Sequence, residues 1–174
     1  ISTDVTQAVN VIKSAILQSQ SRAVRMISGT QLSLYFGIGL YVSANSRKGT
    51  WGTGAIKFIS DQLRRELPGL RGFSEESIKK MRTFSEFWSQ YLNRSPMATE
   101  MDLDKLQDDI ECDRFSLTKW SPMATEINRD EFLGLSFSHH MEILHKTKKI
   151  DEVLLCIHEA VTHQWDKYTL RNIL

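Results

Sequence analysis

Two runs of apolar residues at helical spacing, separated by a proline-glycine pair, constrain the fold of this chain most. Between residues 55 and 67, apolar side chains recur every three or four positions, which places them on one side of an α-helix. The Pro68-Gly69 pair then ends this helix. Ser74 is a good N-cap for the next helix, and two glutamates follow it in the first turn, where carboxylates interact favourably with the helix dipole. The stretch from Trp51 to Trp88 therefore predicts two amphipathic helices joined by a tight turn.

The second of these helices carries a basic outer face. Its inward side is expected to hold Ile78, Met81, Phe84 or Ser85, Trp88 and Tyr91. Its outer side is expected to hold Ser77, Lys79, Lys80 and Arg82. In a helix-turn-helix, such a face lies in the DNA major groove and supplies phosphate contacts and a few base contacts. The pattern thus predicts nucleic-acid binding, and an ordinary solvated surface is the simpler alternative.

The distribution of charge is more informative than its total. The 174 residues carry 22 Lys and Arg against 21 Asp and Glu, so the total charge neither favours nor excludes an anionic partner. Residues 44–94 hold ten basic and five acidic side chains, a local excess of +5, whereas residues 99–113 hold seven acidic side chains and one lysine, a local −6. Positive and negative fields are thereby separated along the chain. An apolar content of 41% is enough for one ordinary core, so we expect a single domain over residues 1–174.

The N-terminal residues 4–43 predict a long helix. Apolar side chains there mostly keep a three-four spacing, at Val5, Val9, Ile12, Ile16, Ala23, Met26, Leu34 and Ile38. Such a heptad packs either on its own domain or on the same helix of a second copy, and we favour its own domain over a homodimer. Gly29, Gly37 and Gly39 leave open whether this is one helix or two collinear ones, because each glycine costs about 1 kcal/mol against alanine in a helix interior.

Residues 93–128 differ in character from the helical segments around them. The hexapeptide SPMATE occurs twice, at residues 95–100 and 121–126, on either side of the acidic stretch. We expect a surface insertion that contains one short helix, residues 103–110. Such an insertion is commonly a solvated loop, and a partner-recognition arm or a mimic of nucleic-acid charge is the functional alternative.

The last third of the chain is again helical. We expect N-caps at Asn128 for a short helix, at Ser136 or Ser138 for the next, and at Asp166 for the last. An apolar helix over residues 150–163 lies between them, and the short link before it suggests a second helix-turn-helix-like unit. His139, His140 and Lys146 would then contact phosphates or base edges. The simpler interpretation of the two histidines is a partly exposed polar face.

Each signal for catalysis or metal binding in the chain fails a geometric test. His158 and His163 flank a glutamate as in a zinc-protease helix, but they are five residues apart rather than four, which turns the second ring about 100° beyond the shared face. His139 and His140 point in different directions, and Cys156 falls within an apolar helix, where a thiol is usually part of the core. We therefore expect no catalytic residue, metal site or cofactor in this chain. The cysteine usage and the lack of an export signal or membrane-spanning segment favour a cytoplasmic protein.

Several short motifs lie on either side of residues 93–128. They are Trp51-Gly52-x-Gly54, Arg71-Gly72-Phe73-Ser74, Met81-Arg82-x-Phe84, Leu135-Ser136-Phe137-Ser138-His139, and Trp165 followed by Leu170, Arg171 and Ile173. Together they resemble the YhcG-like family, formerly a domain of unknown function at the N-terminus of PD-(D/E)XK nucleases. Phe137 stands where this family usually has tryptophan, and Asp166 stands where it has serine.

The resemblance implies an all-helical DNA-recognition module, winged-helix or helix-turn-helix-like, placed ahead of a metal-dependent nuclease. No Pro-Asp pair followed by an acidic-x-Lys motif occurs in this sequence, so the carboxylates for a divalent metal would lie beyond residue 174. We therefore expect an all-α, multi-helix domain that binds DNA, or structured RNA, for a nuclease domain and is not itself an enzyme. The alternative is a protein-interaction or oligomerisation module that uses the N-terminal helix and the acidic insertion.

Overall fold

The described part of the chain consists of helices. The computed structural model describes residues 3–47, 51–91 and 127–174; within residues 3–25 it describes the side chains of 12–16 and 18. Its helices are α1 (Thr3–Arg47), α2 (Ala55–Glu66), α3 (Glu75–Trp88), α5 (Arg129–Gly134), α6 (Phe137–Lys146), α7 (Ile150–Thr162) and α8 (Lys167–Ile173). No strand occurs in these three ranges. The predicted all-α, multi-helix fold with a long N-terminal helix is confirmed.

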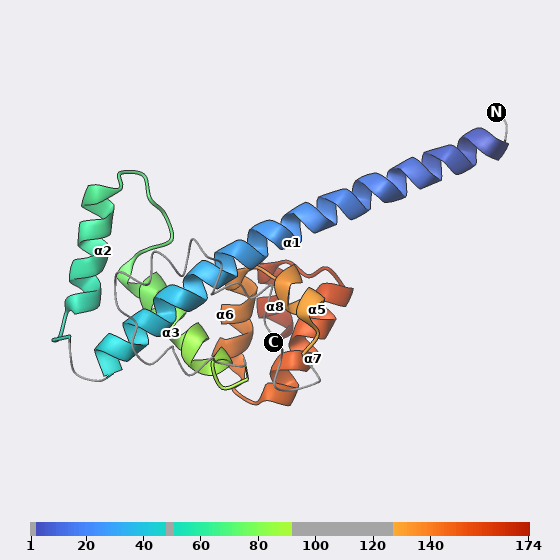
Figure 1. The fold of residues 1–174 in the computed structure, drawn as a ribbon. Coiled ribbons are helices and arrows are strands. Elements are labelled where there is room, and N and C mark those ends of the chain that lie inside the picture. Colours follow the sequence, from blue (N-terminus) through green and yellow to red (C-terminus); the bar gives the residue numbers. More distant parts are fainter. Residues whose placement is uncertain (1–2, 48–50, 92–126) are drawn as a thin grey trace.

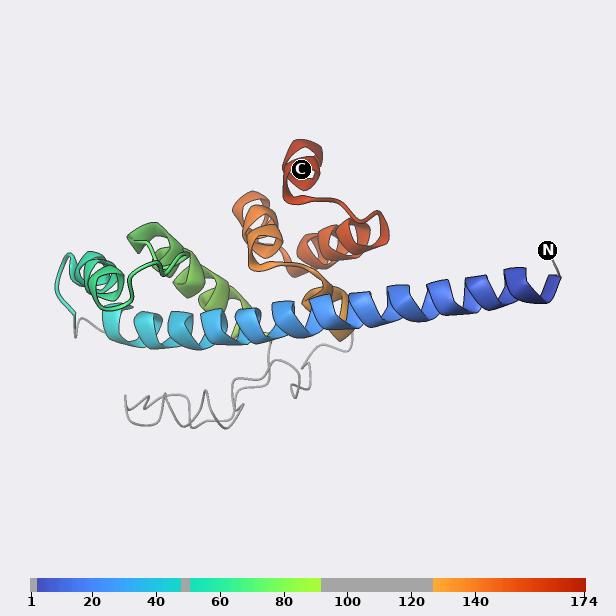
Figure 2. The same ribbon diagram turned by 90° about the horizontal axis from the view of Figure 1, so that it is seen from above.

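Helix α1 is continuous from Thr3 to Arg47, so the alternative of two collinear helices is wrong. Its C-terminal half lies along the rest of the domain, whereas its N-terminal half projects beyond it as a single rod (Figure 1, Figure 2). Leu32 is fully buried, whereas Ile12 and Ile16 are 59% and 51% exposed. The expectation that this helix packs on its own domain therefore holds for its C-terminal half only.

The core is built on a close crossing of α1 and α3. At Gly39, the α1 backbone lies so near α3 that a Cβ atom would be 2.1 Å from the Met81 carbonyl oxygen. The buried hydroxyl of Ser85 donates a hydrogen bond to the Phe36 carbonyl oxygen at 2.7 Å and links the two helices. A glycine that weakens the helix as an isolated segment thus permits the contact between helices. From α3, this core receives Phe84, Phe87 and Trp88.

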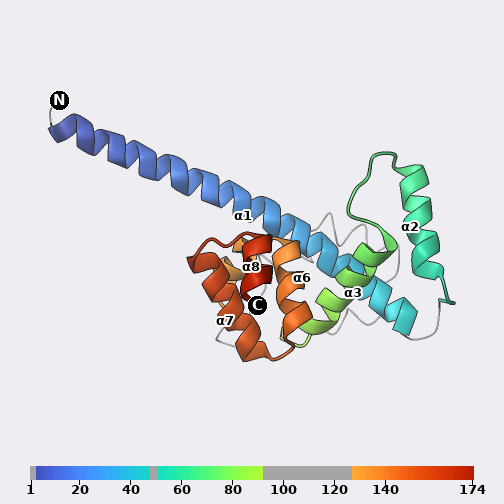
Figure 3. The same cartoon turned by 180° about the vertical axis from the view of Figure 1, so that it is seen from behind.

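Helices α5 to α8 gather beside the same two helices (Figure 1, Figure 3). They share one apolar core with α1 and α3, to which they contribute Phe132, Leu133, Ile143, Leu144, Val153, Ile157 and Leu170. The predicted N-caps Ser74, Asn128 and Asp166 are confirmed, since each side chain accepts a hydrogen bond from a backbone N–H of the following turn. The capped starts and the apolar faces together fix where each short helix begins and which side it buries.

Helix α2 stands apart from this core, at the C-terminal end of α1 (Figure 1). It contacts α1 and α3 through a small apolar cluster in which Val42, Ile56 and Ile78 are buried. The link between α2 and α3 covers eight residues, 67–74, and both Gly69 and Gly72 in it have a positive φ near 90°. A helix-turn-helix usually has a turn of about three or four residues. The link is therefore longer than the tight turn that we predicted, and helix-turn-helix geometry stays a prediction.

The insertion predicted from the sequence lies almost wholly outside the described residues. Both SPMATE copies, the acidic stretch and the expected short helix at residues 103–110 fall within residues 92–126. The predictions made for them stay predictions.

Candidate nucleic-acid interface

An open groove lies between α2 and the first turns of α3. Its volume is about 490 Å³. Its lining consists of Lys57, Ser60, Asp61, Arg64, Ser74, Glu75, Glu76 and Lys79. Three cations and three carboxylates therefore share the groove, and its walls carry no net charge. Its importance lies in the geometry, because it brings side chains of the predicted basic helix beside those of the preceding helix.

Lys79 and Lys80 lie on the exposed outer face of α3, as their spacing predicts. Each lysine contacts the glutamate one turn earlier. Lys79 Nζ lies 2.6 Å from Glu75 Oε1, and Lys80 Nζ lies 2.7 Å from Glu76 Oε1. The hydrogen bond from Lys80 holds the pKa of the Glu76 carboxyl below its ordinary value. The two lysines are thus accessible, but their charge is balanced locally.

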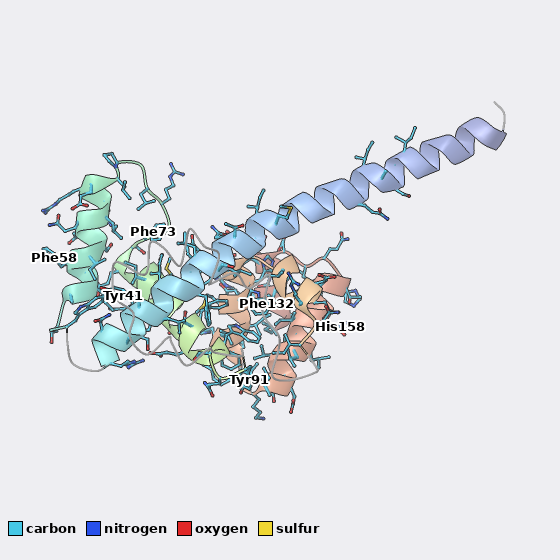
Figure 4. All side chains as sticks on the ribbon, viewed as in Figure 1. Tyr41, Phe58, Phe73, Tyr91, Phe132 and His158 are labelled. Atoms are coloured by element: carbon cyan, nitrogen blue, oxygen red, sulfur yellow. The ribbon has the colours of Figure 1, made fainter. Side chains whose placement is uncertain are left out.

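Three exposed cations without an acidic partner lie on α2 and on the link that follows it. Among the described residues, Lys57, Arg65 and Arg71 form no ion pair, and all three are exposed. Arg64 makes only a loose contact, 3.8 Å long, with the aspartate three residues before it. Phe58, which is 64% exposed, stands on the outer side of α2 (Figure 4). The positive surface at this end of the domain therefore belongs to α2 and its link more than to α3.

Arg82 does not share the outer face of the lysines. Its side chain is 19% exposed, and its Nη1 donates a hydrogen bond to Ser46 Oγ of α1 at 3.1 Å. Arg47 binds Glu86 through Nε and Nη2, at 2.9 and 3.1 Å, and Arg82 lies 4.0 Å from the same carboxylate. The two arginines and the Ser43 hydroxyl lower the pKa of Glu86, with Arg47 having the largest effect. Arg82 thus holds α3 against the end of α1, and its expected place on the exposed face is wrong.

His140 is part of the hydrophobic core. It is 1% exposed, and its ring lies 4.4 Å from that of Phe132, measured between centroids. Its Nε2 hydrogen-bonds to the Phe132 carbonyl oxygen at 3.0 Å, and its Nδ1 has no hydrogen-bond partner among the described residues. Burial lowers the pKa of His140 to about 4, so the ring is neutral at pH 7. The expectation that His140 lies on an exposed polar face and contacts phosphate is therefore wrong.

The remaining predicted site residues divide between structural and exposed positions. His139 is half-buried and bridges two segments, with Nδ1 2.8 Å from Ser136 Oγ and Nε2 3.1 Å from the Trp165 carbonyl oxygen. Ser77 lies beside the α3 N-cap, and its Oγ is 2.9 Å from that of Ser74. Lys146 is exposed at the last residue of α6 and forms no ion pair with the described residues. Of the seven predicted residues, Lys79, Lys80 and Lys146 are therefore the exposed ones.

The spacing of charges in the sequence does not distinguish the α2 cations from the lysines of α3. On α3, each of the paired lysines follows a glutamate by four residues, a spacing that forms one-turn ion pairs. On α2, the three cations precede Glu66 and have only one aspartate among them, and the link then adds Arg71. Asp61 lies four residues after Lys57 and four before Arg65, so spacing alone predicts ion pairs on both helices, and only the structure shows that these two cations form none with the described residues.

The described residues offer little for other kinds of site. Within these ranges, no group of three His, Cys, Asp or Glu side chains could hold a metal ion. His158, considered for zinc, instead contacts Glu131 of α5, with 3.0 Å between Nδ1 and Oε1. Among the described helices, none has both the length and the apolar character needed to cross a membrane.

Comparison with known proteins places the chain in a family. No curated protein and no solved structure matches the chain. One family profile, described as the DUF1016 N-terminal domain, matches residues 11–174. The match covers nearly the whole sequence and agrees with the family-level resemblance of the motifs around Trp51, Leu135 and Trp165. The chain therefore belongs to the DUF1016 N-terminal domain family.

Proposed function

We propose that this domain binds nucleic acid, with duplex DNA as the first candidate and structured RNA as the second. The binding surface would be α2, the link at residues 67–74 and the first turns of α3. The observation that carries this proposal is the set of exposed cations without an acidic partner among the described residues of α2 and its link, Lys57, Arg65 and Arg71; Lys57 lines the groove together with Lys79. Cations of this kind bind phosphates at little cost, because no ion pair has to be broken first.

The lysines of α3 would take part as secondary contacts. Their ion pairs with Glu75 and Glu76 are exposed to solvent, where such pairs contribute little to stability. A phosphate approaching Lys79 or Lys80 can therefore replace the glutamate as the partner. The same glutamates would repel the phosphate, so the α3 face contributes less affinity than its lysine count suggests.

The partner domain of such a module would be a nuclease. The family description names an N-terminal domain, and the sequence motifs resemble the YhcG-like domain found ahead of PD-(D/E)XK nucleases. Under this proposal, the present chain positions the nucleic acid, and the metal-binding carboxylates and the cleavage reaction belong to the nuclease domain. Neither activity nor a metal is assigned to the described residues.

Charge reversal on α2 tests this proposal. Lys57→Glu combined with Arg65→Glu should weaken binding to a labelled duplex at least about tenfold at low salt, because two phosphate contacts are lost and two repulsions are added. The matched control is Arg129→Glu combined with Lys149→Glu, which changes the net charge equally at the starts of α5 and α7. The control should bind as the wild type does within about threefold. Equal loss in both variants, or no binding by the wild type, would refute the proposed surface.

A second candidate function is protein interaction, and one specific observation favours it. The projecting half of α1 exposes large apolar side chains, including Met26 at 67% and Ile27 at 72%. Exposed apolar surface on a helix is typical of a docking site for another protein chain. Binding of nucleic acid and binding of protein use different parts of this molecule, so the charge-reversal experiment separates them.

A further inference from the structure

The projecting half of α1 carries an apolar stripe that no described part of the molecule covers. Ile12, Ile16, Met26 and Ile27 are between 51% and 72% exposed. Around a helix with 100° per residue, these four positions fall within about 100° of one another. They therefore form one stripe that runs along the rod seen in Figure 2.

The sequence continues this stripe in a regular heptad. Alternate steps of four and three residues connect positions 5, 9, 12, 16, 19, 23, 26 and 30, of which Val5, Val9, Ile12, Ile16 and Met26 are large and apolar. Residues 3–28 also contain many β-branched residues and serines, which have low helix propensity. A helix of this composition gains most of its stability from packing, so burial of the stripe against a partner would stabilise the rod.

An apolar groove lies where the rod meets the domain. Its volume is about 620 Å³. Its lining consists of Met26, Ile27, Thr30, Gln31, Leu34 and Tyr35 of α1 with Arg71 and Phe73 of the link. Phe73 is fixed there by an edge contact with Tyr35, whose ring centroid lies 5.9 Å away. The stripe of α1 thus runs directly into this groove, and Arg71 supplies the one cation of its wall.

We propose that a second copy of this chain covers the stripe, with its α1 antiparallel to the first. Charge complementarity argues for the antiparallel direction. Asp4 is the one carboxylate in the first 60 residues, while Lys13, Arg22, Arg25 and Arg71 make the rod and its base positive. Antiparallel pairing brings the partner's Asp4 to the base of the rod, near Arg71 and the groove. Parallel pairing would instead place each charged residue beside the same residue of the other chain, so that like charges face each other.

The register follows from the heptad. Antiparallel helices that face each other with Val9 beside the partner's Met26 also place Ala23 beside the partner's Ile12 and Thr30 beside the partner's Val5. This register uses all eight heptad positions and inserts the first turn of each helix into the groove of the other copy. Ten large apolar side chains would then be covered, five from each copy, and they would bury on the order of 1,000 Å². An interface of this size is about the minimum for a specific dimer.

The dimer extends the function of the domain beyond that of a single nucleic-acid surface. The dimer would place the proposed nucleic-acid surfaces of the two copies at opposite ends of the paired α1 helices. The projecting segment of each α1 is about 39 Å long. The dimer rests on α1 and the groove beside it and not on nucleic-acid binding; the two proposals share only Arg71, so either can fail without the other.

The first test measures the mass of the chain in solution by sedimentation equilibrium. We expect a dimer at concentrations of about 10 µM and above, as for an interface of modest area. Ile12→Asp with Ile16→Asp should make the chain monomeric and reduce its helix content by circular dichroism. The control Ser14→Asp with Gln18→Asp adds the same charge to exposed positions on the opposite face of α1 and should leave the dimer intact. A monomeric wild type at every concentration, or a dimer that survives the isoleucine replacements, would overturn the proposal.

The second test determines the direction of pairing. Cys112 and Cys156 are replaced by serine, and chains carrying Val9→Cys are mixed with chains carrying Met26→Cys under oxidising conditions. We expect disulfide-linked heterodimers of the two variants, because the antiparallel register places these positions together. Preferential linkage of each variant to itself would show parallel pairing and would overturn the proposed arrangement. In addition, Asp4→Arg should weaken the dimer, and Asp4→Arg combined with Arg71→Asp should restore it.

Discussion

The two ends of this domain use polar and charged side chains in opposite ways. At the α2–α3 edge, Lys57 and Arg65 face solvent without an acidic partner, and the lysines of α3 hold only exposed contacts. Among α5 to α8, several polar side chains instead bind the protein itself, as His140 does at the Phe132 carbonyl. Arg171 likewise fastens α8 to α6, since its Nε donates to Glu142 Oε2 at 3.0 Å. The comparison teaches that spacing along a helix sets the direction of a side chain, while neighbouring helices decide whether it meets water or protein.

The largest effect is expected at the close crossing of α1 and α3, which both ends of the domain pack against. Gly39→Ala would place a Cβ atom 2.1 Å from the Met81 carbonyl oxygen, so α1 and α3 would have to move apart. We expect the free energy of unfolding to fall by about 3 kcal/mol, measured by urea denaturation, because backbone cannot yield as a flexible side chain can. Gly52→Ala is the control, since nothing lies within 4 Å of its added Cβ atom. Equal stability of the two variants would contradict the close crossing.

An effect of similar size is expected at His140, but it appears only as the pH is lowered. The pKa of His140 is lowered to about 4 in the folded chain, mainly by burial, against an ordinary value near 6.5. The unfolded chain therefore binds a proton between these values while the folded chain does not, so the contribution of His140 is complete above pH 6.5 and is lost as the pH falls toward 4. We expect a loss of about 3 kcal/mol between pH 7 and pH 4 from this group. Urea denaturation across this range should show a steeper acid-side slope for the wild type than for His140→Gln; parallel curves would contradict the buried neutral ring.

The smallest effect is expected at the glutamates of α3. Glu75→Gln with Glu76→Gln removes two carboxylates beside Lys79 and Lys80 while leaving the core untouched. Affinity for a duplex should rise roughly threefold at low salt, because repulsion falls and both lysines become free for phosphate. Fluorescence anisotropy measures this change, and Asp151→Asn with Glu152→Gln in the first turn of α7 is the matched control. A gain of the same size in the control would show that only net charge matters and that the α3 face has no special role.

The sequence was sufficient to predict much of the fold, because helical periodicity and capping are local. The caps at Ser74, Asn128 and Asp166 and the inward positions of Ile78, Met81 and Trp88 follow from spacing within one helix. The glycines of α1 left open whether the helix is continuous, and the sequence alone could not decide this. Gly39 lowers local propensity, yet the helix continues through it because contact with α3 requires the missing side chain.

The candidate site was less predictable, because it depends on contacts between helices. The spacing placed His140 on the polar side of α6, but α5 covers that side and supplies the Phe132 carbonyl as its partner. Arg82 likewise contacts Ser46 and Glu86, because the end of α1 lies beside this part of α3. Residues such as Arg65 and Arg71, which keep no acidic partner in the described structure, emerge only when every ion pair around them is known.

Amide hydrogen exchange with and without a DNA duplex tests the account most directly, because it reads both ends of the domain in one experiment. We expect slower exchange in α2, in the link at residues 67–74 and in the first turns of α3 when duplex is added at low salt. We expect no change in α5 to α8. Protection confined to α5 to α8, or no protection in any of these segments at a duplex concentration that saturates binding, would contradict the assignment of the α2–α3 edge as the nucleic-acid surface.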